Sequence, residues 1–386
     1  MNLHRRRFLL LLASLSGLGI TTAIRSSLTS HTATKITPQN KGVNLRQKQQ
    51  IANNSSSSKS LQQQNSSRGD VRIVVISDLN SQYGSTNYEP EVDKAIALIP
   101  NWQPNLVLCG GDMIAGQKRS LSESQIEAMW AAFDRHIAAP LRDSGIPFGF
   151  TIGNHDGSGA LVRGELIFQN ERELASAYWN ESQHAPGLSF VDRGNFPFYY
   201  TFSQDKIFYL VWDASTHIIA PQQLAWVEQS LASERAQQAS MRIVIGHLPL
   251  YAVAVGRDKP GEYLDNAEKL RSLLERYQVH TYISGHHHAY YPGKKGHLEL
   301  LHTGALGSSP RQLLNSDLPP RKTLTIVDIF LASATTVYTT YNMQTLELIS
   351  DRSLPEIIFA PNGKVFRRDL QWQTLMPSIS KMHLII

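Results

Sequence analysis

The feature that most constrains the fold is the alternation, after residue 70, of short β-branched segments with amphipathic helical segments. Residues 71–76 are Val-Arg-Ile-Val-Val-Ile, a run typical of a central strand that is covered on both faces. A helical pattern follows over 91–99 and stops at Pro100, and another over 122–139 stops at Pro140. Strands and helices that alternate in this way predict βαβ units and an α/β fold.

The second half of the chain adds antiparallel patterns to these units. Segments 198–202 and 206–212 flank a polar turn and predict a hairpin. Taken together, the segments predict two mixed sheets packed face to face, with helices outside. The remaining predicted strands are 105–109, 147–152, 242–245, 279–283, 297–302, 323–330 and 335–341, and the remaining predicted helices are 221–231 and 266–277.

The turn Gly153-Asn154-His155-Asp156 directly follows an apolar run over 148–152. Glycine permits a tight turn, so an amide, an imidazole and a carboxylate leave the end of the strand together. An amide oxygen can bind a metal ion, and the neighbouring imidazole can give or take a proton beside that ion. Taken alone, the same four residues are equally typical of an ordinary surface turn.

Other predicted strands also end in a glycine or serine followed by an acidic or imidazole side chain. An Asp after a strand is usually a turn or cap residue, and a lone His is usually a loop residue. Five such endings in one chain favour a common site instead, because α/β proteins place their sites at the carboxyl ends of strands. The five endings carry Asp78, Asp112, Asn154 with His155, His247, and His286 with His288.

This series of motifs resembles the calcineurin-like metallophosphoesterase superfamily. The order and relative spacing are similar from residue 72 to about residue 305, which is most of the chain after residue 70. The resemblance implies a four-layer α/β/β/α sandwich that holds two divalent metal ions beside a phosphate site. The motifs that carry it are Asp78-x-Asn80, Gly111-Asp112, Gly153-Asn154-His155-Asp156, Gly246-His247 and Gly285-His286-His287-His288.

The resemblance also implies a role for each motif residue. Asp112 would bridge the two metal ions, and Asp78 and His288 would bind the first. His155 would donate a proton to the leaving oxygen, or stabilise the charge there, and Asp156 would orient its ring. The residues that would bind the second ion are Asn154, His247 and His286.

The chemistry that these residue types predict is phosphate-ester hydrolysis. A phosphate ester is anionic and repels hydroxide, whereas two divalent ions neutralise it, acidify a bridging water and orient in-line attack. Imidazole ligands suit Mn, Fe and Zn better than Mg or Ca. The expected protein is therefore a metal-dependent hydrolase of phosphomonoesters or phosphodiesters that acts on a small phosphorylated substrate.

The chain departs from the family pattern at Asn80, where the family usually has histidine. An amide oxygen is a poorer ligand for these ions, so the first site is expected to be weak or to fill only with substrate. Tyr83 is a candidate to compensate, although packing is its simpler role. Purple acid phosphatases also lack that histidine, but they carry a tyrosine where this chain has Ala115. The alternatives are a metal- or phosphate-binding module without catalysis, and a cell-surface interaction protein without metal.

Net charge does not support a nucleic-acid-binding protein. The formal charge of the whole chain is +5, from 37 basic and 32 acidic residues. Residues 1–69 contain ten Lys or Arg and no Asp or Glu, so the rest of the chain has 27 basic and 32 acidic residues. The part that is expected to fold is therefore mildly acidic. A single cysteine, Cys109, excludes an intramolecular disulfide.

The N-terminal residues have the pattern of an export signal. Arg5-Arg6-Arg7 precede an apolar run that reaches Ile24, as in the charged and apolar regions of a secretory signal. Arg5-Arg6-x-Phe8-Leu9 also resembles the twin-arginine export motif. We therefore expect an exported protein, in a periplasm, a lumen or outside the cell, with a possible membrane tether through this segment.

The composition divides the chain into four expected parts. Segment 28–69 is rich in Ser, Gln and Asn and has too few apolar residues to fold, so it is predicted to be a disordered linker. The Asn362-Gly363 pair predicts a hairpin turn within 357–367. The parts are a signal peptide or anchor at 1–27, the linker at 28–69, a metallophosphoesterase domain at 70–345 and a C-terminal extension at 346–386.

Several other side chains have ordinary structural interpretations. His287 is expected to face away from the metals, and His302 to be a core or edge histidine. His217 is expected on a surface loop, although substrate contact is open to it. The aromatic residues predicted to lie in the core are Trp130, Phe133, Trp179 and Trp226.

Overall fold

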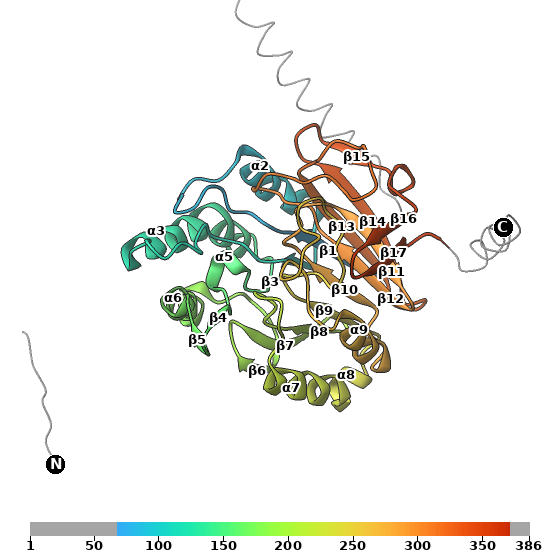
Figure 1. The fold of residues 1–386 in the computed structure, drawn as a ribbon, viewed down its shortest axis with the longest axis horizontal. Helices are drawn as coiled ribbons and strands as arrows, with labels where there is room; N and C mark the ends of the chain where they lie inside the picture. The colour runs from blue at the N-terminus through green and yellow to red at the C-terminus, as the bar shows by residue number, and fades with distance from the viewer. Residues whose placement is uncertain (1–67, 371–386) are drawn as a thin grey trace, which may run out of the picture. The chain divides into compact units, whose positions relative to one another are not determined.

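The computed structural model describes residues 68–370, in which two large mixed sheets carry flanking helices (Figure 1). The α/β/β/α sandwich predicted from the motifs is therefore confirmed. The predictions for 1–27 and 28–67, with the export signal, the tether and the linker, lie outside the described residues. So do residues 371–386 of the C-terminal extension. Within the described range, none of the helices has the length and apolar character needed to cross a membrane.

The first sheet has a parallel half and an antiparallel half. Strands β1, β2 and β3 pair in parallel, whereas β13, β14 and β15 are antiparallel. All six residues of β1 are buried, as expected of a central strand. The order is β15 (Glu347–Ile349), β14 (Thr335–Asn342), β13 (Thr323–Phe330), β1 (Val71–Ile76), β2 (Leu106–Cys109) and β3 (Phe148–Phe150).

The second sheet is larger and also mixed. Its central strands β8, β9, β10 and β12 are parallel, and antiparallel strands extend it on both sides. The order is β16 (Ile357–Ala360), β17 (Gly363–Arg367), β11 (Tyr291–Lys295), β12 (Leu298–His302), β10 (Thr281–Ser284), β9 (Met241–Ile245), β8 (Ile207–Val211), β7 (Tyr199–Gln204) and β6 (Phe190–Asn195).

The two sheets meet where β7 approaches β3. The Tyr200 hydroxyl donates to the Phe150 carbonyl at 2.6 Å and accepts from the Phe150 amide at 3.1 Å. Because β3 ends the first sheet, this hydroxyl satisfies backbone groups that an edge strand would otherwise leave unpaired. Beside it, a Cβ on Gly149 would lie 3.0 Å from the ring of Phe202, so glycine permits the close packing.

Helices cover the two sheets, as Figure 1 shows for α2 and α3 near the first sheet and for α7 and α9 near the second. A short ribbon, β4 (Leu161–Val162) with β5 (Glu165–Leu166), lies between α5 and α6 in the chain. The α-helices are α2 (Pro90–Leu98), α3 (Glu123–Phe133), α4 (Ala139–Asp143), α5 (Asn154–Gly157), α6 (Gln169–Asn180), α7 (Pro221–Ala232), α8 (Glu234–Gln237) and α9 (Ala267–Arg276), and 3-10 turns lie at Ile99–Trp102, Ser182–His184 and Asp351–Ser353.

The helix predicted over 122–139 does not stop at Pro140, so that prediction is wrong. After α3, the chain forms a π-helical turn over Asp134–Ala138 and continues as α4 through Pro140 to Asp143. Proline lacks the N–H that an interior helical residue needs, but the wide turn lets Pro140 take a place at the start of a new helix.

The described part of the C-terminal extension belongs to the two sheets rather than to a separate appendage. Strand β15 joins the first sheet, and β16 and β17 join the second. The predicted hairpin is present, but Ala360 pairs with Gly363, so the turn lies one residue earlier than predicted. The Asn362 side chain accepts from the Ala252 amide and donates to the Leu250 carbonyl. Its position is therefore determined by these distant contacts.

The aromatic core prediction is right for Trp130, Phe133 and Trp179, which are buried. It is wrong for Trp226, which is only half-buried on α7. The Trp226 indole N–H donates to the Asp192 carboxylate at 2.8 Å, and the ring packs against Tyr199. An indole needs a partner for its N–H, and the surface strand β6 supplies one.

Candidate metal centre

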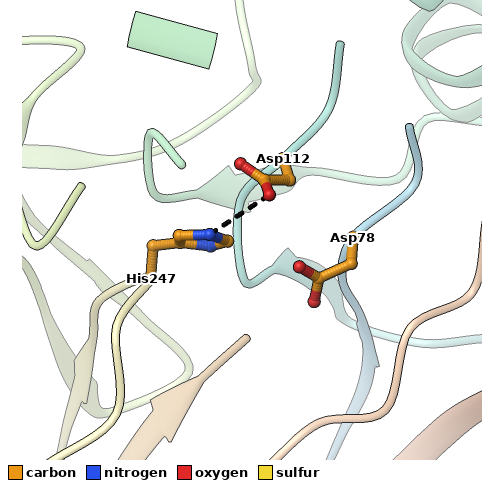
Figure 2. A group of neighbouring side chains, drawn as sticks. All are labelled: Asp78, Asp112 and His247. Carbon is orange, nitrogen blue, oxygen red and sulfur yellow. Dashed lines mark ion pairs between the residues drawn. The ribbon is translucent and has the colours of Figure 1, made fainter. Parts of the chain in front are cut away.

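The ends of separate strands bring Asp78, Asp112 and His247 together. One ligand atom from each of these buried residues lies within 4.8 Å of the others. Figure 2 shows the two carboxylates and the imidazole entering the same space from different loops, with Asp112 paired to His247. The three loops are far apart in the sequence, so the topology of the two sheets brings these residues together.

The backbone is strained at four of the predicted ligands. Asp78, Asp112, His286 and His288 have φ values of 51°, 55°, 65° and 53°, a left-handed region that such residues seldom occupy. Residues held in this conformation cluster at active sites, where the surrounding structure enforces them. The strain therefore supports a functional role for these four positions.

Glycines allow the ligand loops to approach one another. A Cβ on Gly153 would lie 2.2 Å from Asp112 Oδ1, and one on Gly285 would lie 2.2 Å from Ser77 Oγ. The φ of Gly153 is −90°, which any residue adopts. The glycine of the Gly-Asn-His-Asp turn is therefore required by close approach to Asp112, and not by the turn geometry that the sequence suggested.

A group of nitrogen and oxygen atoms converges around the Asn154 side chain. Its amide oxygen lies 2.9 Å from His247 Nε2 and 2.9 Å from His286 Nδ1. The Asp112 carboxylate lies 3.3 Å from the same His247 nitrogen. Metal–ligand bonds of about 2.0–2.2 Å place neighbouring ligands of one ion at about this separation. Three of these side chains, Asn154, His247 and His286, are those that the motifs assigned to the second ion. The fourth, Asp112, is the one assigned to bridge the two ions.

A positive charge would stabilise the atoms that converge there. His247 Nδ1 lies 2.7 Å from the Gly110 carbonyl, which can only accept, so Nδ1 carries a hydrogen and Nε2 is the atom that faces the Asp112 and Asn154 oxygens. Burial opposes protonation of His247, but the Asp112 charge outweighs it and raises the pKa of His247 to about 9. A divalent metal ion fits the same place, because it would replace that proton.

The residues that the motifs assigned to the first ion converge less completely than those assigned to the second. His288 Nε2 lies 3.2 Å from Asp78 Oδ1, while its Nδ1 lies 2.9 Å from the Ser309 carbonyl. Although burial opposes it, the neighbouring His288 holds the pKa of Asp78 below its usual range. Asn80 is buried nearby, but its amide oxygen accepts a hydrogen bond from the Ser308 hydroxyl. Asn80 therefore lies at the site with its ligand atom already engaged.

Glu262 is a site residue that the motifs did not identify. Its carboxylate lies 3.0 Å from His286 Nε2 and also pairs with Arg257. The hydrogen bond from His286, opposed by burial and aided by Arg257, lowers the pKa of Glu262 to about 2. Burial lowers the pKa of His286 to about 4, so His286 is neutral, donates from Nε2 and leaves Nδ1 free for a metal. A carboxylate in this place fixes the ligating tautomer.

His155 lies beside the cluster of ligand side chains. The prediction that Asp156 orients the His155 ring is wrong. Asp156 accepts from the Met113, Ile114 and Gly153 amides at 2.7, 2.9 and 2.8 Å. Burial raises the pKa of Asp156 to about 7, which the N–H groups oppose. Its role is to join two ligand loops.

The His155 ring is oriented by the backbone instead. Its Nδ1 lies 3.1 Å from the Gly116 carbonyl, so Nε2 is the atom left for chemistry. That Nε2 lies 3.9 Å from Asp112 Oδ2, and the His155 amide donates to Asp112 Oδ1 at 2.8 Å. The Tyr83 ring packs against the His155 ring, with 5.0 Å between the ring centroids, and Tyr83 is 56% exposed.

Gln117 was also missed by the motifs. Its side-chain oxygen accepts from Asn154 Nδ2 at 2.7 Å, which turns the Asn154 amide oxygen toward the histidines. The backbone amide of Gln117 in turn donates to the Glu171 carboxylate of α6. No local sequence signal marks Gln117 or Glu262, because each acts on a ligand residue that the fold brings next to it.

Two of the histidines that lie outside the cluster, His287 and His302, are buried. His287 accepts from the Val253 amide and bonds to the Glu262 carbonyl, so it is turned from the cluster as expected. His302 is buried at the end of β12, and its ring nitrogens have no hydrogen-bond partner within residues 68–370. Burial lowers the pKa of His302 to about 3, which keeps the ring neutral.

A cleft of about 780 Å³ opens beside Asn154 and His286. His217 lines it from a partly exposed loop and pairs with Asp265 at 3.0 Å, so the predicted surface-loop position is confirmed and this loop borders the cleft. Clefts of this volume accommodate substrates and cofactors. Its polar lining side chains are Gln117, Asn154, Ser158, Arg172, Asp213, Ser215, Thr216, His217, Gln223, Arg257, Glu262 and His286.

Solved structures of similar fold include a phosphatase. Purple acid phosphatase PPD1 from yellow lupin (Lupinus luteus) is 15% identical, with a TM-score of 0.52 and coverage of 72% of this chain. This chain spans about half of that protein, 52% of its length. GAP50, the anchor in the inner membrane complex of Plasmodium, is 13% identical, with a TM-score of 0.46 and coverage of 72% of this chain and 87% of that one.

A third similar structure is a putative 5′-nucleotidase from Staphylococcus aureus, 12% identical, with a TM-score of 0.41 and coverage of 81% of this chain and 58% of that one. No curated protein matches the chain. The sequence model of the family described as calcineurin-like phosphoesterase matches residues 71–290, more than half of the chain. This range contains every motif residue described above. The chain therefore belongs to the calcineurin-like phosphoesterase family.

Proposed function

We propose that this protein hydrolyses phosphomonoesters or phosphodiesters at a centre of two divalent metal ions. The observation that carries the proposal is the convergence of metal-ligand atoms from separate loops. The Asp112 and Asn154 oxygens face His247 Nε2, and the same Asn154 oxygen faces His286 Nδ1. Buried acceptors are normally paired with donors, so a cation belongs among them.

The donor set favours Mn, Fe or Zn over Mg or Ca, because three of its six residues are histidines. Asp78, His288 and Asp112 would hold the first ion, and Asn80 Oδ1, which accepts one hydrogen bond from Ser308, would be its weaker neighbour. When bound, the ions would supply positive charge to the phosphate oxygens and activate a water molecule as the nucleophile. The residues that would hold the second ion are Asp112, Asn154, His247 and His286.

The chain itself supplies the proton for the leaving group. The Gly116 carbonyl fixes His155 Nδ1–H, so protonated His155 can donate only from Nε2, next to Asp112. Proton transfer from a positioned histidine is worth about 10²–10⁴-fold in rate. His155 acts as this donor, and Glu262 and Gln117 keep His286 and Asn154 oriented.

The direct test is metal dependence. The purified protein is expected to hydrolyse an aryl phosphate when Mn²⁺ is added and to lose this activity in a chelator. Mn, Fe or Zn should restore it, and Mg or Ca should not, because half of the ligand residues are histidines. Elemental analysis of the same sample should find up to two ions per chain. Full activity in the chelator would contradict the proposal.

A second candidate function is metal or phosphate binding without catalysis, and the Asn80–Ser308 hydrogen bond favours it. The variant Asn80→His separates the two functions. If the protein is an enzyme as it stands, Asn80→His should change kcat by less than about tenfold, or about 1.4 kcal/mol in barrier. A rise from no activity to clear turnover, together with greater metal content, would identify the natural protein as the binding module.

A further inference from the structure

The cleft beside the metal centre has one wall of exposed aliphatic side chains. Leu161 and Leu166 are opposite each other in the β4–β5 ribbon, on the same face, and both line the cleft. Ile218, from the segment after β8, lines it as well. Leu161 is 60% exposed and Ile218 is 56% exposed. Aliphatic side chains held open to water at the edge of a cleft gain free energy when an apolar group covers them.

The other face of the ribbon provides an internal comparison. Val162 and Glu165 are the second opposed pair, and side chains of neighbouring residues in a strand point to opposite faces. Val162 is 52% exposed, nearly as much as Leu161, but it does not line the cleft. The two residues therefore differ in which side of the ribbon they cover.

The polar wall of the cleft is electrically balanced. Arg172 pairs with Asp213 at 2.7 Å, and Arg257 pairs with Glu262. The two histidines that line the cleft, His217 and His286, also face carboxylates. Within residues 68–370, each basic side chain that lines the cleft thus has an acidic partner.

Because its charges are paired, the cleft offers no spare positive charge for a second phosphate. Arginine and lysine side chains commonly bind phosphate groups in proteins through charge-assisted hydrogen bonds. The arginines here already form such bonds, and Arg172 in addition donates to the Gly157 carbonyl. A polyphosphate or a nucleic-acid backbone does not match this lining.

We propose that the cleft binds the organic part of a phosphate ester whose alcohol is uncharged and carries an apolar chain or ring. The phosphate would lie at the Asn154 and His286 end, and the apolar body would lie against Leu161, Leu166 and Ile218. The volume of about 780 Å³ is that of clefts that hold drug-sized molecules. This inference rests on the proposed phosphoesterase function and specifies its substrate class.

The test is a series of alkylphosphonates from methyl to octyl, titrated into the Mn²⁺-loaded protein by calorimetry. The C–P bond is not hydrolysed as an ester, so binding is read without turnover. Each added methylene is expected to tighten binding by up to about fourfold until the apolar wall is covered, which is 0.8 kcal/mol per methylene expressed as a ratio. A flat series would overturn the proposal.

The matched variants are Leu161→Ser and Val162→Ser. Both positions are exposed on one ribbon, so thermal unfolding should be unchanged in both. Leu161→Ser is expected to weaken octylphosphonate about fivefold to tenfold and to leave methylphosphonate unchanged, because only the longer chain reaches the wall. Val162→Ser should leave both ligands unchanged. Equal losses in the two variants would contradict the assignment of the wall.

Competition separates this inference from the proposed function. A nucleoside 5′-triphosphate should compete with octylphosphonate less well than an alkyl monophosphate does, and stronger competition would overturn the charge argument. If esters are hydrolysed without regard to chain length, the cleft assignment fails and the phosphoesterase function stands. If no phosphate ester is hydrolysed with any metal, both fail.

Discussion

Asp112→Asn is expected to remove bound metal from the protein and to lower kcat at least about 10³-fold. The carboxylate lies in the cluster with Asp78 and His247, and it is the residue proposed to contact both ions. An amide has no charge to balance two cations, and metal ions supply several kcal/mol of charge stabilisation in such reactions. The measurements are metal content by elemental analysis and kcat with Mn²⁺ in excess.

The Asp112→Asn variant should still fold. An asparagine side-chain oxygen can still accept from the His155 amide, as Asp112 Oδ1 does at 2.8 Å. Asp134→Asn is the control, because Asp134 pairs with Arg142 and Tyr178 and lies outside the cluster. Two ions per chain and activity within tenfold of the natural protein would show that Asp112 is not the bridge.

The sequence could predict the ligand loops because each one follows a strand with a clear local signal. The β-branched run of β1 marks a buried strand, and Asp78 comes directly after it. Strand ends that share an edge of an α/β sheet place their following residues together. The approach of Asp78 and Asp112 follows from the adjacent strands β1 and β2, whereas His247 follows β9 of the second sheet and reaches them only because the two sheets pack together.

The residues that orient the ligands could not be predicted in this way. Glu262 and Gln117 act on His286 and Asn154 across 24 and 37 positions of sequence. Neither belongs to a strand end or to a motif. For Asp156, the resemblance implied a contact with the His155 ring that is not made, because its carboxylate accepts from three backbone amides.

Fold details were missed where a local rule was overridden by tertiary contacts. Strand β11 contains Pro292 and Gly293, which argue against a strand, yet it lies between β12 and β17. A Cβ on Gly293 would lie 2.6 Å from Val365, so the glycine permits close packing of that pair. The hairpin at Asn362 deviates for the same kind of reason, whereas the helix passes Pro140 through a local π-helical turn.

His155→Ala is expected to lower kcat by about 10²–10⁴-fold while both metal ions remain bound. The contact of His155 with the cluster that matters for folding is its backbone amide, which donates to Asp112 Oδ1, and alanine keeps that amide. The ring nitrogen Nε2, at 3.9 Å from Asp112 Oδ2, is the group that is lost. His297→Ala is a matched control, because His297 is exposed and its amide also donates to a carboxylate, that of Glu275.

The leaving group decides whether His155 acts as a proton donor. A nitrophenolate leaves without a proton, whereas an alkoxide needs one, so His155→Ala should reduce alkyl phosphate hydrolysis far more than nitrophenyl phosphate hydrolysis. A residue that only bound the phosphate would reduce both reactions by the same factor. Equal losses for the two esters would therefore reassign His155 from proton transfer to phosphate binding, with the Gly116 contact serving only to hold the ring in place.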